Sequence, residues 1–154
     1  MAGYLQFSLQ NEHMKSGPIV VLEDDEDDKE VLESILKELN VKNKLIWFNK
    51  AEEAYHYLKT TSEQPFVIIS DVNIPVENGI EFKRRIDNDP YLRQKSIPFV
   101  FYSTSVKQET VTQVYSELTV QGFFKKGNSH EEIKRHIKLI VDYWMVCRHP
   151  NSKD

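Results

Sequence analysis

Residues 66–79 read FVIISDVNIPVENG, a short apolar run followed by an aspartate and a turn-forming segment. The run at 66–70 is apolar at every position but the last, which is typical of a strand buried on both faces of a parallel sheet. Asp71 follows this run directly. Functional groups of such sheets gather beyond the carboxyl ends of the strands, so Asp71 is the first candidate for a functional residue.

Strand-length runs recur on both sides of this segment, and helical patterns alternate with them. The further runs are 18–22 (PIVVL), 45–48 (LIWF), 97–102 (IPFVFY) and 122–125 (GFFK). Residues 26–39 carry one amphipathic stripe, and Asn49 is a candidate N-cap of the next helix. Capping pairs are predicted to open three more helices: Asn78 with Glu81, Ser105 with Gln108, and Ser129 with Glu132. Five strands alternating with five helices predict an α/β fold, with a doubly wound five-stranded parallel sheet covered on both faces.

The length and composition are those of one folded domain. The chain has 154 residues, 40% of them hydrophobic and 29% charged, without an apolar stretch long enough for a membrane helix or a signal peptide. We expect a domain at 18–147, a flexible leader at 1–17 and a polar tail at 148–154 that frays. The single cysteine, Cys147, excludes a disulfide framework and a cysteine-rich zinc site, and it favours a cytoplasmic protein. A net charge of −4 argues against nucleic-acid binding.

Acidic residues crowd the end of the first run. Six consecutive acids occupy positions 23–28, of which 26–28 suit the acidic first turn of a helix. Glu23 and Asp24 lie at the strand end itself, where clustered carboxylates repel one another unless a divalent cation with a preference for oxygen ligands joins them. Asp71 is expected to converge with this pair, because the first and third strands are neighbours in a doubly wound sheet.

Hydroxyl and ammonium groups follow the last two strands. Ser103 and Thr104 end the fourth run, and Lys125 and Lys126 end the fifth. A lysine can pair with a phosphoryl oxygen, and an aspartate can act as the nucleophile that takes up a phosphoryl group. A metal would neutralise the charge on the transferring oxygens. The combination is therefore the set needed for phosphoryl transfer onto a carboxylate.

These segments resemble, in order, the motifs of the receiver domain of two-component response regulators. The similar stretches are VVLEDDEDD, VIISDVNIPVENG, FVFYSTS and GFFKKGNS, and the resemblance runs from about Pro18 to Trp144. It implies a flavodoxin-like, CheY-like sheet in the order 2-1-3-4-5. It also implies a signalling protein rather than an enzyme, with at most self-phosphorylation from a donor and slow self-dephosphorylation.

The resemblance assigns a role to each residue of the site. It makes Asp71 the phosphoacceptor. The implied Mg²⁺ (or Mn²⁺) ligands are the side chains of Glu23, Asp24 and Asp71 and the backbone carbonyl of Asn73. Ser103 and Lys126 would contact the phosphoryl group, with Ser103 and Phe123 as the switch residues.

The resemblance also implies partners. A sensor histidine kinase or a histidine phosphotransfer protein would donate the phosphoryl group. A downstream protein target would dock on the face formed by the fourth helix, the fifth strand and the fifth helix, where Tyr115, Phe123 and Phe124 are the candidate aromatic anchors. Whether the protein forms a homodimer stays open.

One position departs from the family pattern, which usually has proline after the lysine. Gly127 stands there, so the Lys126–Gly127 bond is expected to be trans. Lys125 competes for the lysine role, but Lys126 keeps Phe123 in register, three residues before it.

Three other functions compete with a phosphoacceptor. A haloacid-dehalogenase-like, Mg²⁺-dependent phosphatase also uses a strand-end aspartate, but it needs a second acid two residues later, where this chain has Asn73. A flavodoxin-like flavin carrier needs a phosphate-binding loop after the first strand, where the acids would repel phosphate. A degenerate receiver that only binds partners is disfavoured by the intact set of acids, hydroxyl and lysine.

Overall fold

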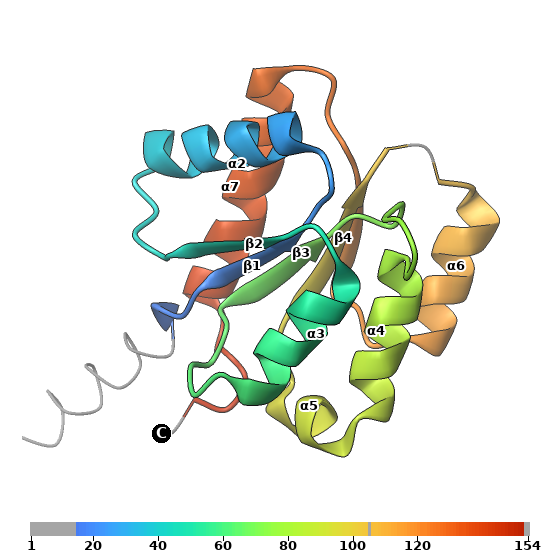
Figure 1. Ribbon diagram of the computed structural model, residues 1–154. Coiled ribbons are helices and arrows are strands. Elements are labelled where there is room, and N and C mark those ends of the chain that lie inside the picture. The colour runs from blue at the N-terminus through green and yellow to red at the C-terminus, as the bar shows by residue number, and fades with distance from the viewer. Residues whose placement is uncertain (1–14, 105, 153–154) are drawn as a thin grey trace, which may run out of the picture.

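The computed structural model describes residues 15–104 and 106–152, which form a sheet with helices on both sides (Figure 1). The strands lie within two residues of the predicted runs. They are β1 (Ile19–Leu22), β2 (Leu45–Phe48), β3 (Val67–Ser70), β4 (Phe99–Ser103) and β5 (Gly122–Lys125).

Six helices in the described residues pack against the sheet, one more than the sequence analysis predicts. They are α2 (Glu26–Glu38), α3 (Ala51–Thr60), α4 (Gly79–Asn88), α5 (Pro90–Lys95), α6 (Gln108–Glu117) and α7 (His130–Val146). The helix that was not predicted is α5, a six-residue element that begins at Pro90 and is capped by the side chain of Asp89. It was missed because only Leu92 of this helix is buried, so it has no amphipathic stripe to detect.

The five strands are parallel in the order β2-β1-β3-β4-β5, which confirms the predicted topology. Strand β1 pairs with β2 and β3, and its last residue, Leu22, lies level with Ser70 at the end of β3. On the other side, Ser103 at the end of β4 lies level with Lys125 at the end of β5. The carboxyl ends of four strands therefore meet along one edge of the sheet.

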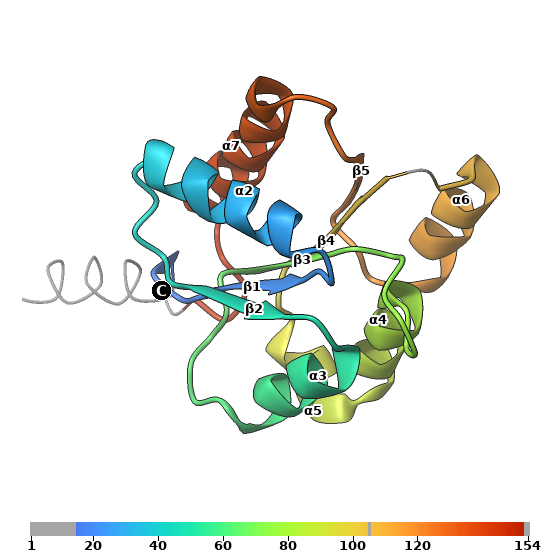
Figure 2. The same ribbon diagram turned by 45° about the horizontal axis from the view of Figure 1, so that its top comes forward.

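Side chains alternate between the two faces of the sheet and build two apolar cores. Figure 2 shows α2 and α7 on one side of the sheet and α3, α4 and α5 on the other. Val20 and Leu22 of β1 join the core with α3–α6, whereas Ile19 and Val21 join the core with α2 and α7. Burial on both faces explains why the strands are continuous apolar runs.

The helix caps match the sequence in part. The side chains of Asn78 and Ser129 accept hydrogen bonds from the backbone N–H groups of Glu81 and Glu132, which confirms two predicted capping pairs. The prediction of an Asn49 cap is wrong: α3 starts one residue later, with Lys50 at the N-cap and no side-chain cap. The predicted pair of Ser105 with Gln108 lies partly outside the described residues, since Ser105 is not among them.

Both ends of the described chain are held at the amino ends of the strands. Asn43 donates hydrogen bonds to the carbonyls of Lys15 and Gly17, each at 2.8 Å; residues 1–14 of the predicted leader lie outside the described residues. The polar tail does not fray where we expected it to. His149 is 2% exposed, stacks on Phe66 and contacts the carbonyl of that residue at 2.7 Å.

Candidate functional site

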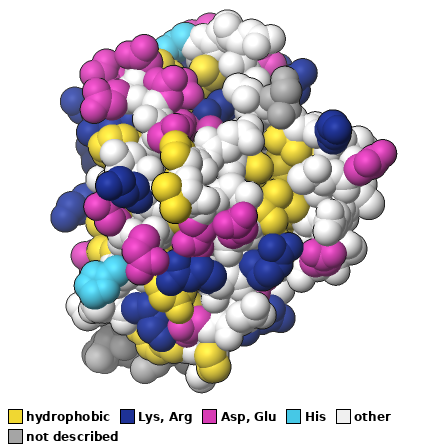
Figure 3. Space-filling model, turned by 45° about the vertical axis from the view of Figure 1, so that its right-hand side comes forward, with side chains coloured by type: hydrophobic (Ala, Val, Ile, Leu, Met, Phe, Trp, Pro, Cys, Tyr) yellow, Lys and Arg dark blue, Asp and Glu magenta, His cyan; other side chains and the backbone are white. Residues whose placement is uncertain are grey.

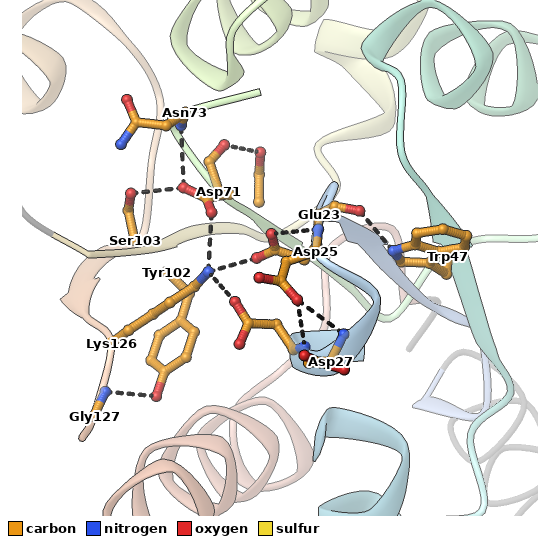
Figure 4. A network of polar contacts seen from close by, with 12 residues as sticks. Glu23, Asp25, Asp27, Trp47, Asp71, Asn73, Tyr102, Ser103, Lys126 and Gly127 are labelled. Carbon is orange, nitrogen blue, oxygen red and sulfur yellow. Dashed lines mark hydrogen bonds and ion pairs between the residues drawn. The ribbon is translucent and has the colours of Figure 1, made fainter. Parts of the chain in front are cut away.

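The polar residues predicted at the strand ends converge at one point (Figure 4). Glu23 follows β1, Asp71 follows β3, Ser103 ends β4 and Lys126 follows β5. Glu23, Asp71 and Ser103 are all less than a tenth exposed. The parallel register brings these four side chains together, although they lie up to 103 positions apart in the sequence.

The carboxylate of Asp71 is held by a hydrogen bond on each side. The Ser103 hydroxyl donates to Oδ1 at 2.7 Å, and the backbone N–H of Asn73 donates to the same oxygen at 3.1 Å. The Lys126 ammonium donates to Oδ2 at 2.9 Å. Asp71 is thus oriented from its own loop, from β4 and from the segment after β5.

Lys126 is shared among three carboxylates. Its Nζ lies 2.6 Å from Oε2 of Glu23, 2.9 Å from Oδ2 of Asp28 and 2.9 Å from Oδ2 of Asp71. Lys125, the competing lysine, is the last residue of β5 and is exposed. The structure therefore brings Lys126 into the cluster and leaves Lys125 on the surface.

The loop between β1 and α2 shapes the acidic side of the site. Asp25 caps α2, because its carboxylate accepts hydrogen bonds from the N–H groups of Asp27 and Asp28. Glu23 Oε1 accepts the N–H of Asp25 at 3.1 Å, and the Glu23 carbonyl accepts the indole N–H of Trp47 at 2.7 Å. These bonds leave Asp24 exposed at the mouth of the site.

Burial and charge shift the pKa values of the cluster in different directions. Burial is the main cause that raises the pKa of Glu23 to about 7, although Lys126 opposes the shift. Burial alone would also raise the pKa of Asp71, but the hydrogen bonds from Ser103 and Lys126 hold it below its usual value. Burial would lower the pKa of Lys126, whereas the hydrogen bonds to Asp28, Glu23 and Asp71 raise it above its usual value. Asp71 is therefore ionised at neutral pH, and Glu23 is close to its titration point.

The donor set fits a hard divalent cation. Glu23, Asp24 and Asp71 each offer a carboxylate oxygen, and these three oxygens lie within 4.8 Å of one another. Mg²⁺ and Mn²⁺ prefer oxygen ligands, and a cation would offset the repulsion among these carboxylates. Asn73, whose carbonyl was the fourth predicted ligand, is exposed beside Asp71.

A small cavity opens on the cluster. It measures about 130 Å³ and is lined by Glu23, Asp28, Asp71, Thr104 and Lys126, among others. This space is small and is flanked by an ammonium group, a hydroxyl and carboxylates as well as by apolar side chains such as Val31 and Ile133. Chemically, the arrangement can present one oxygen of Asp71 to an incoming electrophile while Lys126 and a cation balance the negative charge.

Two residues of the site were not singled out by the sequence analysis. Asp28 was interpreted as an ordinary acid of the helix start, yet it contacts Lys126. Its position in the helix could have indicated this contact. Asp28 lies three residues before Val31 and four before Leu32, so it shares the inward-facing side of the helix with them. Tyr102 also lines the cavity, and no sequence pattern distinguishes it from an ordinary core residue of β4.

The predicted aromatic residues lie on different surfaces. Phe123 is half-buried and packs on Phe101 at a centroid distance of 5.2 Å, on the side of the sheet that carries α6. Phe124 faces the opposite side, as alternation along a strand requires, and packs near Tyr102. Tyr115 on α6 is half exposed.

A family model, the response regulator receiver domain, matches residues 19–138. This chain belongs to the response regulator receiver family. The match covers the whole sheet and all four strand ends that build the site. The receiver domain therefore acts in two-component signalling, as its family does, and receivers of this kind are typically signalling proteins rather than enzymes.

Curated and solved relatives agree with this assignment. The receiver is 26% identical over 132 residues to the response regulator Rcp1 of Synechocystis sp., covering 82% of this chain and 88% of Rcp1. The Mn²⁺-bound structure of Rcp1 superposes with a TM-score of 0.75 and 25% identity, covering 86% of this chain and 97% of that one. The phosphorylated cyanobacterial phytochrome response regulator RcpA gives a TM-score of 0.74 and 25% identity, covering 84% and 94%.

Two further findings concern the peptide bonds and the helices of the receiver. No peptide bond in the described part of the chain is cis, so the Lys126–Gly127 bond is trans, as expected. Within the same residues, none of the helices combines the length and the apolar character needed to cross a bilayer.

Proposed function

We propose that this receiver accepts a phosphoryl group on Asp71 in a reaction that requires Mg²⁺ or Mn²⁺. A carboxylate oxygen of Asp71 forms a bond to phosphorus, while the bond between phosphorus and the donor group breaks. The observation that carries the proposal is the Asp71 carboxylate itself, which is oriented by Ser103 and Lys126 and surrounded by two further acids. The phosphorylated structure of the related RcpA supports it.

The cation would be held by Glu23, Asp24 and Asp71, with the Asn73 carbonyl as the fourth protein ligand. Mg²⁺ usually keeps several waters and binds one or two carboxylates directly, so Glu23 would act through a water. When bound, the cation neutralises charge on the transferring phosphoryl oxygens. The carboxylate cluster and the Mn²⁺-bound structure of the related Rcp1 support this part.

The donor is a sensor histidine kinase or a histidine phosphotransfer protein, and the receiver does not turn over an outside substrate. A phosphatase would need a general acid two residues after the nucleophile, where Asn73 offers no titratable group. The single cysteine fits a reducing compartment, and we place the reaction in the cytoplasm.

The signal leaves the site through Ser103 and Phe123. The phosphoryl oxygens would accept hydrogen bonds from Ser103 and Lys126, and an inward movement of Ser103 would free space for the Phe123 ring. Phe123 lines a groove of about 600 Å³ together with Thr104, Val106, Lys107, Gln108, Val111 and Lys125. Figure 3 shows hydrophobic side chains gathered in a hollow on the side of the molecule that carries α6. A downstream protein target docks on this face. The side chains of the face pack in two alternative ways, and phosphorylation changes the populations of these two conformations.

Labelling with acetyl phosphate tests the proposal. Incubation with Mg²⁺ should add one phosphoryl group, detected by intact-mass spectrometry and removed by hydroxylamine. Asp71→Asn should abolish the labelling, and Asp27→Asn, a control in the acidic first turn of α2 but outside the cluster, should label like the parent. Labelling of Asp71→Asn at the parent's rate would overturn the assignment.

A further inference from the structure

The backbone that carries Lys126 is fastened to β4 by two consecutive hydrogen bonds. The N–H of Lys126 donates to the Ser103 carbonyl at 2.8 Å. The N–H of Gly127 donates to the Tyr102 hydroxyl at 3.3 Å. The second bond is drawn beside the Lys126 side chain in Figure 4. It requires a residue with an N–H at position 127, which a proline lacks.

Tyr102 is itself fixed on both sides. It is 4% exposed, and its ring packs against Phe124 and His136 at centroid distances of 6.4 and 5.8 Å. Its hydroxyl lies 3.0 Å from Nδ1 of His136 on α7. Since the hydroxyl oxygen accepts the Gly127 N–H, its own proton is available to His136 Nδ1 when that nitrogen is unprotonated. The chain of contacts therefore runs from α7 through Tyr102 to the turn after Lys126.

The turn leaves no room for a side chain at position 127. A Cβ on Gly127 would lie 2.9 Å from Cγ of Glu132 and 3.1 Å from the backbone nitrogen of Ile133. Glycine is the most flexible residue, so the turn has no stiffness of its own at this point. Besides this close packing on α7, hydrogen bonds fix its conformation, namely those of Lys126 and Gly127 to β4 and that of the Asn128 N–H to Glu132 at 3.1 Å.

Neighbouring residues of β4 thus serve different parts of the site. Ser103 points toward Asp71 and donates to it, whereas Tyr102 points to the other face and accepts from Gly127. Lys126 has to hold its ammonium group near Asp71 against the pull of Glu23 and Asp28, which lie at 2.6 and 2.9 Å. A shift of the backbone at Lys126 would change which carboxylate the ammonium group meets.

We propose that Tyr102, braced by His136, is a positioning residue that holds the Lys126 backbone in place through the Gly127 N–H. The inference rests on the proposed function, because it concerns the lysine used in phosphoryl transfer to Asp71. Tyr102 does not touch the reacting atoms. It fixes the origin of the Lys126 side chain.

A double-mutant cycle tests this role. The rate of labelling by acetyl phosphate with Mg²⁺ is measured for the parent, Tyr102→Phe, Lys126→Met and the double variant. Tyr102→Phe should slow labelling roughly tenfold to a hundredfold, the range expected for a misplaced catalytic group. In the Lys126→Met background the same change should have no further effect. The exposed control Tyr143→Phe should label like the parent, and His136→Ala, which removes the brace at α7, should slow labelling in the same direction as Tyr102→Phe.

The outcomes separate this inference from the proposed function. If the parent takes up no phosphoryl group, the proposed function fails and the role of Tyr102 fails with it. If the parent labels and Tyr102→Phe labels at the same rate, only the positioning role is overturned. If Tyr102→Phe slows labelling equally in the parent and in the Lys126→Met background, its effect is a general structural one, and the positioning role is again overturned. Urea unfolding of each variant verifies that the compared proteins are folded.

Discussion

Two buried lysines lie near opposite ends of the sheet and differ in the charge around them. Lys126 follows the carboxyl end of β5 and contacts three carboxylates. Lys83 on α4 lies over the ring of Phe99, the first residue of β4, and pairs with Asp87 at 2.8 Å. Both side chains are largely buried, with 11% exposure for Lys126 and 4% for Lys83.

The contrast separates a structural charge pair from a reactive one. Asp87 also accepts hydrogen bonds from the backbone and hydroxyl of Thr119, and its Oδ1 lies 3.9 Å from Nη1 of Arg93. Burial lowers the pKa of Lys83, whereas the surrounding carboxylates raise the pKa of Lys126. The single carboxylate of Asp87 is therefore fully balanced by the cations beside it, Lys83 and Arg93. The Lys126 cluster carries excess negative charge, which a cation can balance.

The largest effect on stability is expected when the ion pair of Lys83 and Asp87 is broken. Asp87→Leu leaves the buried Lys83 ammonium without a carboxylate partner, with only the Thr119 hydroxyl to accept from it at 3.1 Å, and should lower the free energy of unfolding by about 3–5 kcal/mol. The double variant Lys83→Met with Asp87→Leu should recover most of the loss, because an apolar pair of similar volume often replaces a buried ion pair without cost. Urea unfolding measures both. A loss below about 1 kcal/mol in the single variant, the level of an exposed ion pair, would show that the pair is not effectively buried.

The next effect is on chemistry rather than on stability. Lys126→Met should slow phosphoryl transfer from acetyl phosphate roughly 10²–10³-fold, the range for loss of one charge-stabilising donor. Lys83→Met, the matched change at the other lysine, should leave the transfer rate of the folded protein unchanged. The contrast between the two lysines would be wrong if both substitutions slowed transfer equally.

A divalent cation should stabilise the protein by binding at the Lys126 cluster, which carries excess negative charge. Mg²⁺ at about 100 times its Kd should raise the free energy of unfolding by about 2.7 kcal/mol in the parent. Asp24→Ala should abolish both this gain and phosphorylation while the protein stays folded, and it should slightly stabilise the metal-free form by removing a repelling carboxylate. The exposed control Asp27→Ala should keep the gain. An undiminished gain in Asp24→Ala would remove Asp24 from the cation site.

The smallest effect concerns pH in the absence of cations. Burial raises the pKa of Glu23 from 4.5 to about 7. Because the folded value lies above the unfolded one, Glu23 contributes stability that is complete below about pH 4.5 and is lost as the pH rises through 7. The pKa of Asp71 is lowered, so Asp71 stays ionised and contributes a constant amount over this window. Urea unfolding in EDTA should therefore show stability falling from pH 5 to 8, with a flatter profile for Glu23→Gln. Equal slopes in both proteins would contradict the assignment to Glu23.

Much of the fold could be predicted from the sequence because its determinants are local. Continuous apolar runs mark strands buried on both faces, and the strand order follows from their alternation with helices and from the family resemblance. The four strand-end residues Glu23, Asp71, Ser103 and Lys126 could be placed near one another for the same reason. A parallel sheet brings the residues after its strands to one edge, whatever their distance in the sequence.

The features that the sequence analysis missed depend on tertiary contacts. Asp28 looks like any acid in the first turn of a helix until β5 brings Lys126 to it. The contact between Gly127 and Tyr102 arises only because the turn packs closely on α7. His149 stands in a polar tail, where composition cannot show that one aromatic ring will be buried against Phe66.

The most direct test of Asp71 as the phosphoacceptor is a beryllofluoride titration followed by amide NMR, since this adduct mimics an aspartyl phosphate. With Mg²⁺ present, saturable shifts are expected at Asp71 and through residues 103–126, while the amides of Lys83 and Asp87 stay in place. Asp71→Asn should show none of these shifts. Shifts confined to residues 23–25 and 71–73 would contradict transmission to Phe123. Parent shifts that persist unchanged in Asp71→Asn would contradict the central assignment of Asp71.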